Sequence, residues 1–100
     1  MKKEAYIVSS VRTAVGKANR GSLRHMRPED LGGAVVKSAV DKVKGLAPEQ
    51  IDDVLIGCAM PEGQQGLNMG RIIAQIAGLP DSVPGATINR FCSSGLQTIA

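Results

Sequence analysis

The feature that most constrains the fold is an alternation of short, β-rich apolar runs with longer segments of helical character. The apolar runs are AYIVSSV (5–11), DDVLIGCA (52–59) and GATINRF (85–91). Strands that alternate with helices imply right-handed crossover connections, and therefore a mainly parallel sheet covered by helices. The sequence thus predicts an α/β fold in the order strand, helix, strand, helix, strand, helix.

The helices are predicted from their start and stop signals. The first helix begins at Pro28, a residue that suits the first helical position, and Gly45 ends it. Asn68 is the expected N-cap of the second helix, and Gly78 lies at its end. The third helix begins in SSGLQTIA and has not ended at residue 100. Because three parallel strands also leave open sheet edges, we expect the fold to be incomplete at residue 100.

Composition excludes several classes of protein. Five of the cationic side chains lie between Arg12 and Arg27 with no acid among them. This basic segment is interpreted as a solvated loop, with a phosphate-bearing ligand as the alternative. A nucleic-acid partner is not expected, because no aromatic residues are interleaved with the charges. No apolar run is long enough for a membrane span, and two cysteines indicate a reducing, cytoplasmic environment.

Common cofactor and metal motifs do not occur. Gly16 and Gly21 have the spacing of a phosphate-binding loop but lack its Lys-Ser/Thr pair, and no G-x-G-x-x-G follows the first apolar run. His25, Cys58 and Cys92 lack the spacing of metal ligands, so no metal site is expected. His25 is interpreted as an exposed, incidental histidine, and Cys58 as a small buried apolar residue.

Cys92 occupies a position with chemical consequences, between an apolar strand-like run and the start of a helix in NRFCSSGLQTIA (89–100). The first turn of a helix offers unpaired backbone N–H groups and the positive end of the helix dipole. These groups favour the thiolate, the reactive form of cysteine, and stabilise an oxyanion on a carbonyl that the sulfur attacks. Position alone leaves two interpretations open, a small buried side chain or a nucleophile.

The same segment resembles the acyl-enzyme signature of the thiolases, in which Asn, two residues, Cys, Ser, Ser and Gly follow one another. Three further stretches are similar to this family: IVSSVRTAVGKANRGSL (7–23), IDDVLIGCAMPEGQQGLNMGR (51–71) and VPGATINRFCSSG (83–95). The second of these resembles degradative 3-ketoacyl-CoA thiolases in particular, and the likeness extends along the whole chain. Ala14 stands where thiolases often have proline, which affects the rigidity of that loop and leaves the chemistry unchanged.

The resemblance implies a function for the chain. Residues 1–100 would be the N-terminal part of the thiolase N-terminal domain, with Cys92 as the catalytic nucleophile. The implied reaction is thiolysis of a 3-ketoacyl-CoA to acetyl-CoA and a shortened acyl-CoA through an acyl-cysteine. Coenzyme A would be a co-substrate, no cofactor would be bound permanently, and the full-length subunit would form a homodimer or homotetramer.

Two catalytic motifs of the family are absent from these 100 residues. A histidine motif activates the nucleophile and a glycine-rich motif carries a second cysteine, and His25 and Cys58 match neither. The 100-residue piece alone is therefore expected to be inactive. The alternatives are a biosynthetic acetoacetyl-CoA thiolase, which condenses two acetyl-CoA, and a non-catalytic interface fragment if the chain is complete. A redox sensor at Cys92 is disfavoured because no resolving cysteine lies beside it in sequence.

Overall fold

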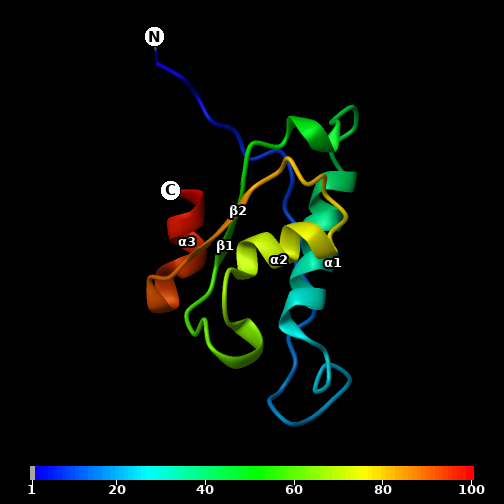
Figure 1. The fold of residues 1–100 in the computed structure, drawn as a ribbon, viewed down its shortest axis with the longest axis vertical. Helices are drawn as coiled ribbons and strands as arrows, with labels where there is room; N and C mark the ends of the chain where they lie inside the picture. Colours follow the sequence, from blue (N-terminus) through cyan, green and yellow to red (C-terminus); the bar gives the residue numbers. More distant parts are fainter. Residues whose placement is uncertain (1) are drawn as a thin grey trace.

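The computed structural model describes residues 2–100, and within them a two-stranded parallel sheet is covered by helices on both faces (Figure 1). The helices are α1 (Pro28–Asp41), α2 (Met69–Ile76) and α3 (Ser94–Ile99), and the strands are β1 (Val54–Gly57) and β2 (Gly85–Ile88). Short 3₁₀ turns span Pro48–Gln50, Gly63–Gln65 and Phe91–Ser93. α3 packs on one face of the sheet, α2 on the other, and α1 packs against α2. The predicted α/β class is confirmed.

The two parallel strands and the helix between them form one β-α-β unit. Val54 pairs with Gly85 and Gly57 with Ile88, in parallel register. The unit is closed by Asn68, whose predicted role as N-cap is confirmed. Its side chain accepts a hydrogen bond from the Arg71 N–H at 3.4 Å and donates one to the Gly85 carbonyl at 2.8 Å. One side chain therefore both caps α2 and ties it to β2.

A small apolar core lies between the sheet, α1 and α2. Its central member is Val83, in the connection that leads into β2, with no exposed surface. The other buried members are Val54, Ala74, Ala77 and Leu79, and the partly buried residues packed on them are Val36, Val40, Ile51 and Ile56. The β1 members, Val54 and Ile56, lie on one face of the strand and pack with residues of α1, α2 and the connecting segments, so the core holds the β-α-β unit and α1 together.

α1 begins where the sequence predicts it. Pro28 occupies the first helical position, and Glu29 lies in the first turn. A hydrogen bond from the Glu29 backbone N–H, together with the Arg27 guanidinium, lowers the pKa of the Glu29 carboxyl group. The predicted end at Gly45 is wrong: the helix ends at Asp41, and Gly45, at a φ of 82°, lies in the turn that follows. That φ favours glycine, which explains why Gly45 follows the helix.

The strand predicted at residues 5–11 is not formed, and this part of the prediction is wrong. The segment is extended, but it pairs with no strand among residues 2–100. Tyr6 and Ile7 are 75% and 77% exposed, and Figure 1 shows the N-terminal segment running away from the body of the molecule. An apolar, β-branched composition makes a segment suitable for a sheet, but a strand exists only with a hydrogen-bonding neighbour.

The end of β1 lies directly against the start of α3. A Cβ atom built on Gly57 would lie 2.6 Å from the Ser94 carbonyl carbon and 2.6 Å from the Gly95 nitrogen. No side chain larger than hydrogen fits this contact, so glycine is required where the two backbones meet. The first turn of α3 is thereby fixed to the sheet, next to the residues that follow β2.

Candidate functional site

Cys92 lies in a tight turn between β2 and α3. The strand ends at Ile88, a 3₁₀ turn spans Phe91–Ser93, and α3 follows without a break. The sequence predicted a strand as far as residue 91 and placed Cys92 in the first turn of the helix, so both boundaries are corrected. The strand ends at Ile88, where its pairing with β1 ends at Gly57, and Phe91, with a left-handed φ of 48°, then turns the chain out of the extended conformation.

The turn is closed by hydrogen bonds from its own residues. The Ser94 hydroxyl accepts from the Arg90 N–H at 2.9 Å and donates to the Phe91 carbonyl at 2.6 Å. The Asn89 side-chain oxygen accepts from the Phe91 N–H at 2.9 Å, and the Ser93 N–H donates to the Arg90 carbonyl at 3.0 Å. Polar side chains that bond to nearby backbone groups in this way stabilise turns rather than regular structure.

The Cys92 thiol is free and exposed at the middle of this turn. An exposed sulfur is accessible to an acyl carbonyl, and a turn closed by several hydrogen bonds holds it in a limited range of positions. The arrangement is therefore suited to attack of the Cys92 sulfur on an acyl carbonyl, with formation of a thioester. This geometry excludes the small buried side chain, the other interpretation that position alone left open for Cys92.

Cys58 has the opposite environment. It directly follows β1, its N–H donates to the Ile88 carbonyl at 3.0 Å, and it is buried. Its side chain lines an apolar hollow of about 370 Å³. The hollow is also lined by residues of α1, the β1–α2 loop and α2, among them Leu31, Met60 and Met69. The prediction that Cys58 is a small buried apolar residue is confirmed.

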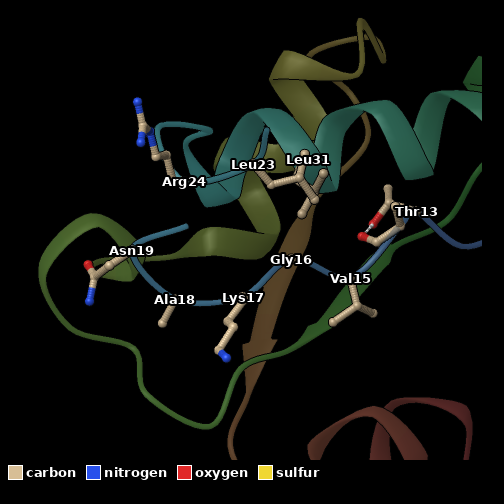
Figure 2. Close-up of a pocket in the computed structure, with 10 residues that line it drawn as sticks. Thr13, Val15, Gly16, Lys17, Ala18, Asn19, Leu23, Arg24 and Leu31 are labelled. Atoms are coloured by element: carbon tan, nitrogen blue, oxygen red, sulfur yellow. Dashed lines mark hydrogen bonds between the residues drawn. The ribbon is translucent and has the colours of Figure 1, made fainter. Parts of the chain in front are cut away.

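The basic segment forms a loop around a second hollow, of about 380 Å³ (Figure 2). Arg27 pairs with Glu29, whereas Arg12, Lys17, Arg20 and Arg24 have no ion pair within residues 2–100. Figure 2 shows the Lys17 and Arg24 side chains at the rim of the hollow, pointing away from each other. Cations that do not converge on one point favour the solvated loop over a phosphate site.

The remaining candidate residues do not assemble a second site. His25 is exposed in the same basic loop, as predicted. Among residues 2–100, no group of three or more His, Cys, Asp or Glu side chains has the arrangement of a metal site. No helix in the described part of the chain combines the length and the apolar character needed to cross a membrane.

The roles of two residues at the site were not predicted from the sequence. The Ser94 hydroxyl bonds to the Arg90 N–H and to the Phe91 carbonyl, and a serine at the start of a helix is a residue type that commonly bonds to nearby backbone groups. Gly57 admits α3 to the sheet, and a lone glycine inside a strand pattern signals the close approach of another backbone. Neither signal says which partner is approached.

Comparison with known proteins identifies the fold family. Residues 5–100 match the family described as Thiolase, N-terminal domain. The chain belongs to the thiolase family. The resemblance seen in the sequence is confirmed, and Cys92 lies in the segment that carries it.

Relatives of this thiolase chain are similar over nearly its whole length. A 3-ketoacyl-CoA thiolase of Bacillus subtilis (strain 168) is 57% identical over 98 residues, which cover 98% of this chain and 25% of the relative. A β-ketoadipyl-CoA thiolase of Pseudomonas knackmussii is 41% identical over 99 residues, 99% of this chain and 24% of the relative. A peroxisomal 3-ketoacyl-CoA thiolase 5 of Arabidopsis thaliana is 43% identical over 94 residues, 94% of this chain and 20% of the relative. The chain thus spans about a quarter of the length of these relatives or less.

Proposed function

We propose that Cys92 is the nucleophile of a thiolase that cleaves 3-ketoacyl-CoA with coenzyme A. The observation that carries this proposal is the free, exposed thiol of Cys92 in a hydrogen-bonded turn at the end of a parallel strand. Carboxyl ends of parallel strands are where open α/β sheets commonly bind their ligands. The other cysteine, Cys58, is buried and is not available for attack.

In the proposed reaction the Cys92 thiolate attacks the 3-keto carbon of the substrate and a C–S bond forms. The C2–C3 bond then breaks, and its electron pair leaves on acetyl-CoA as the enolate, which takes up a proton. The shortened acyl group remains on the sulfur as a thioester. A second coenzyme A thiolate attacks that thioester, releases the shortened acyl-CoA and regenerates the Cys92 thiolate, in ping-pong order.

The proton transfers need groups that we do not assign to this chain. His25 is exposed in the basic loop, and Cys58 is buried beneath the β1–α2 loop. We propose instead that residues 1–100 supply the nucleophile to a complete thiolase subunit, and that the isolated piece is inactive. The complete subunit would assemble as a homodimer or homotetramer in the cytoplasm. Acyl-CoA and coenzyme A are the proposed partners, with coenzyme A as co-substrate rather than a permanently bound cofactor.

The names of the relatives favour two acyl substrates. The relative at 57% identity is named 3-ketoacyl-CoA thiolase, and relatives near 41% are named β-ketoadipyl-CoA thiolase. We therefore place the 3-ketoacyl-CoA of a simple fatty acyl chain first and β-ketoadipyl-CoA second, ahead of the biosynthetic direction. Comparing kcat/KM of the complete subunit for the two substrates and for the condensation of acetyl-CoA ranks these candidates.

The nucleophile is tested by trapping the acyl-enzyme. The complete subunit is exposed briefly to acetyl-CoA, digested, and searched for an acetyl adduct by peptide mass spectrometry. The expected adduct is on the peptide that contains Cys92, and it disappears when coenzyme A is added. The Cys92→Ser variant is the control for peptide assignment. An adduct that persists in that variant, or that forms on Cys58, contradicts the proposal.

A further inference from the structure

We propose that Ser94 is the positioning residue of this site, holding the Cys92 turn in the conformation from which the sulfur reacts. The inference rests on the proposed role of Cys92 as nucleophile. It assigns to Ser94 a role in the rate of the reaction, distinct from its place in the sequence signature.

The first support is the pattern of hydrogen bonds. The Ser94 hydroxyl accepts from the Arg90 N–H and donates to the Phe91 carbonyl, so both of its partners precede Cys92 while Ser94 itself follows it. The two bonds measure 2.9 and 2.6 Å. Cys92 is therefore enclosed in a ring that a single side chain closes, and rotation of the Phe91–Cys92 backbone would break that ring.

The second support is the strained backbone inside the ring. Phe91 has a φ of 48° and a side chain that is 71% exposed. An aromatic residue rarely adopts a left-handed φ, and such a conformation persists only where the surroundings hold it in place. The Phe91 N–H bonds to the Asn89 side chain and its carbonyl to Ser94, so both of its backbone polar groups are held.

The third support is the burial of Ser94 and the close contact of its backbone with β1. Its residue surface is only 4% exposed, and its backbone meets the sheet where a Cβ on Gly57 would lie 2.6 Å from the Ser94 carbonyl carbon. Because the Ser94 backbone packs against β1, the hydrogen bonds of its hydroxyl hold the Cys92 turn in place relative to the sheet. A buried hydroxyl with both of its bonds made is expensive to remove, because its partners are then left unpaired.

The neighbouring serine provides a matched control. Ser93 is exposed, and its side chain forms no hydrogen bond with any of residues 2–100. Ser93 and Ser94 carry the same chemical group on either side of one peptide bond. Only the hydroxyl of Ser94 is bound to the backbone before Cys92, so the two variants separate positioning from a general loss of polarity.

The test uses the complete subunit with Ser94→Ala, Ser93→Ala and Ser94→Thr. We expect Ser94→Ala to lower kcat about 10- to 100-fold with little change in KM, since a displacement of about 1 Å of a reacting group costs up to about 100-fold. Ser93→Ala is expected to lower kcat by a clearly smaller factor than Ser94→Ala, because the Ser93 hydroxyl bonds to none of residues 2–100, and an equal loss in both variants contradicts the inference. Ser94→Thr, which keeps the hydroxyl, is expected to restore more than half of the lost rate.

A second readout reports the sulfur itself. The rate of Cys92 alkylation by iodoacetamide is measured against pH in the parent and in each variant. A positioning role predicts that Ser94→Ala shifts this pH profile, because the sulfur moves relative to the backbone N–H groups of the turn. A role confined to stability lowers the melting temperature and leaves the profile of the folded fraction unchanged, and that result overturns the inference.

A substitution at an exposed residue of the same turn keeps the inference testable if Ser94→Ala does not fold. Asn89→Ala removes the bond to the Phe91 N–H from an exposed position. It is expected to lower kcat in the same direction by a smaller factor, and an unchanged kcat overturns the inference. Cys92→Ser separates the two proposals: activity retained in Cys92→Ser defeats the nucleophile, whereas activity lost there but retained in Ser94→Ala defeats only the positioning role.

Discussion

The ends of β1 and β2 differ although the two strands are parallel neighbours and each leads to a cysteine. Cys58 directly follows β1 and is buried, whereas Cys92 lies four residues after Ile88, the last residue of β2, and is exposed. The backbone leaving each strand makes the difference. After β1 the chain enters a loop that, with α1 and α2, encloses the thiol, and after β2 it enters a tight turn that presents the thiol to solvent.

The comparison shows that residue type and strand position do not determine whether a cysteine is reactive. Both thiols follow apolar strands that are hydrogen-bonded to each other, and the Cys58 N–H even bonds to the Ile88 carbonyl. Cys58 continues the alternation of β1 and points with Val54 and Ile56 toward α1 and α2. Cys92 escapes this alternation because the left-handed Phe91 redirects the chain.

The strongest way to break the comparison is to exchange sulfur for oxygen at each end. In the complete subunit, Cys92→Ser is expected to lower kcat by a factor on the order of 10⁴ or more, as loss of a nucleophile does. Cys58→Ser is expected to keep kcat within a few-fold, while a buried hydroxyl without a partner costs about 1–3 kcal/mol of stability. Thiolysis assays and thermal unfolding measure the two effects. Equal loss of activity in both variants would contradict the distinction.

Alkylation sharpens the same comparison without a substrate. Iodoacetamide under native conditions is expected to modify Cys92 at least about 100-fold faster than Cys58, because Cys58 reacts only when its surroundings open. In urea the two rates are expected to converge, which provides the control for intrinsic reactivity. Peptide mass spectrometry of samples taken over time measures both rates. Comparable labelling of Cys58 in the native protein would show that the end of β1 is open.

A third experiment tests the contact that joins the two ends. Gly57→Ala places a methyl group where the structure has 2.6 Å to the backbone of Ser94 and Gly95, and we expect a loss of about 1–3 kcal/mol of stability from overpacking. Gly95→Ala is the matched control, because a Cβ there meets nothing within 4 Å. A helical glycine replaced by alanine is expected to gain about 0.5–1 kcal/mol. Urea unfolding of both variants decides, and equal effects would mean that α3 does not rest on β1 through Gly57.

Much of the local structure could be predicted from the sequence. Pro28 and Asn68 mark the starts of α1 and α2, Gly78 follows the end of α2 at a φ of 81°, and the burial of Cys58 was expected. These signals succeed because capping and left-handed turns depend on a few adjacent residues. The strand predicted at residues 5–11 is not formed, because a suitable composition does not supply the neighbouring strand that pairing requires.

The sequence by itself indicated the order of the helices, the β1–α2–β2 unit and the thiolase family, and it singled out Cys92 as the candidate nucleophile. Only the tertiary structure decided that residues 5–11 pair with no strand among residues 2–100, that Asn68 bonds to Gly85 across 17 positions, and that Ser94 closes the turn against Gly57. Local signals act through one or two turns of backbone. Pairing, burial and close backbone contact depend on groups brought together from distant positions, and their energies exist only once the chain has folded.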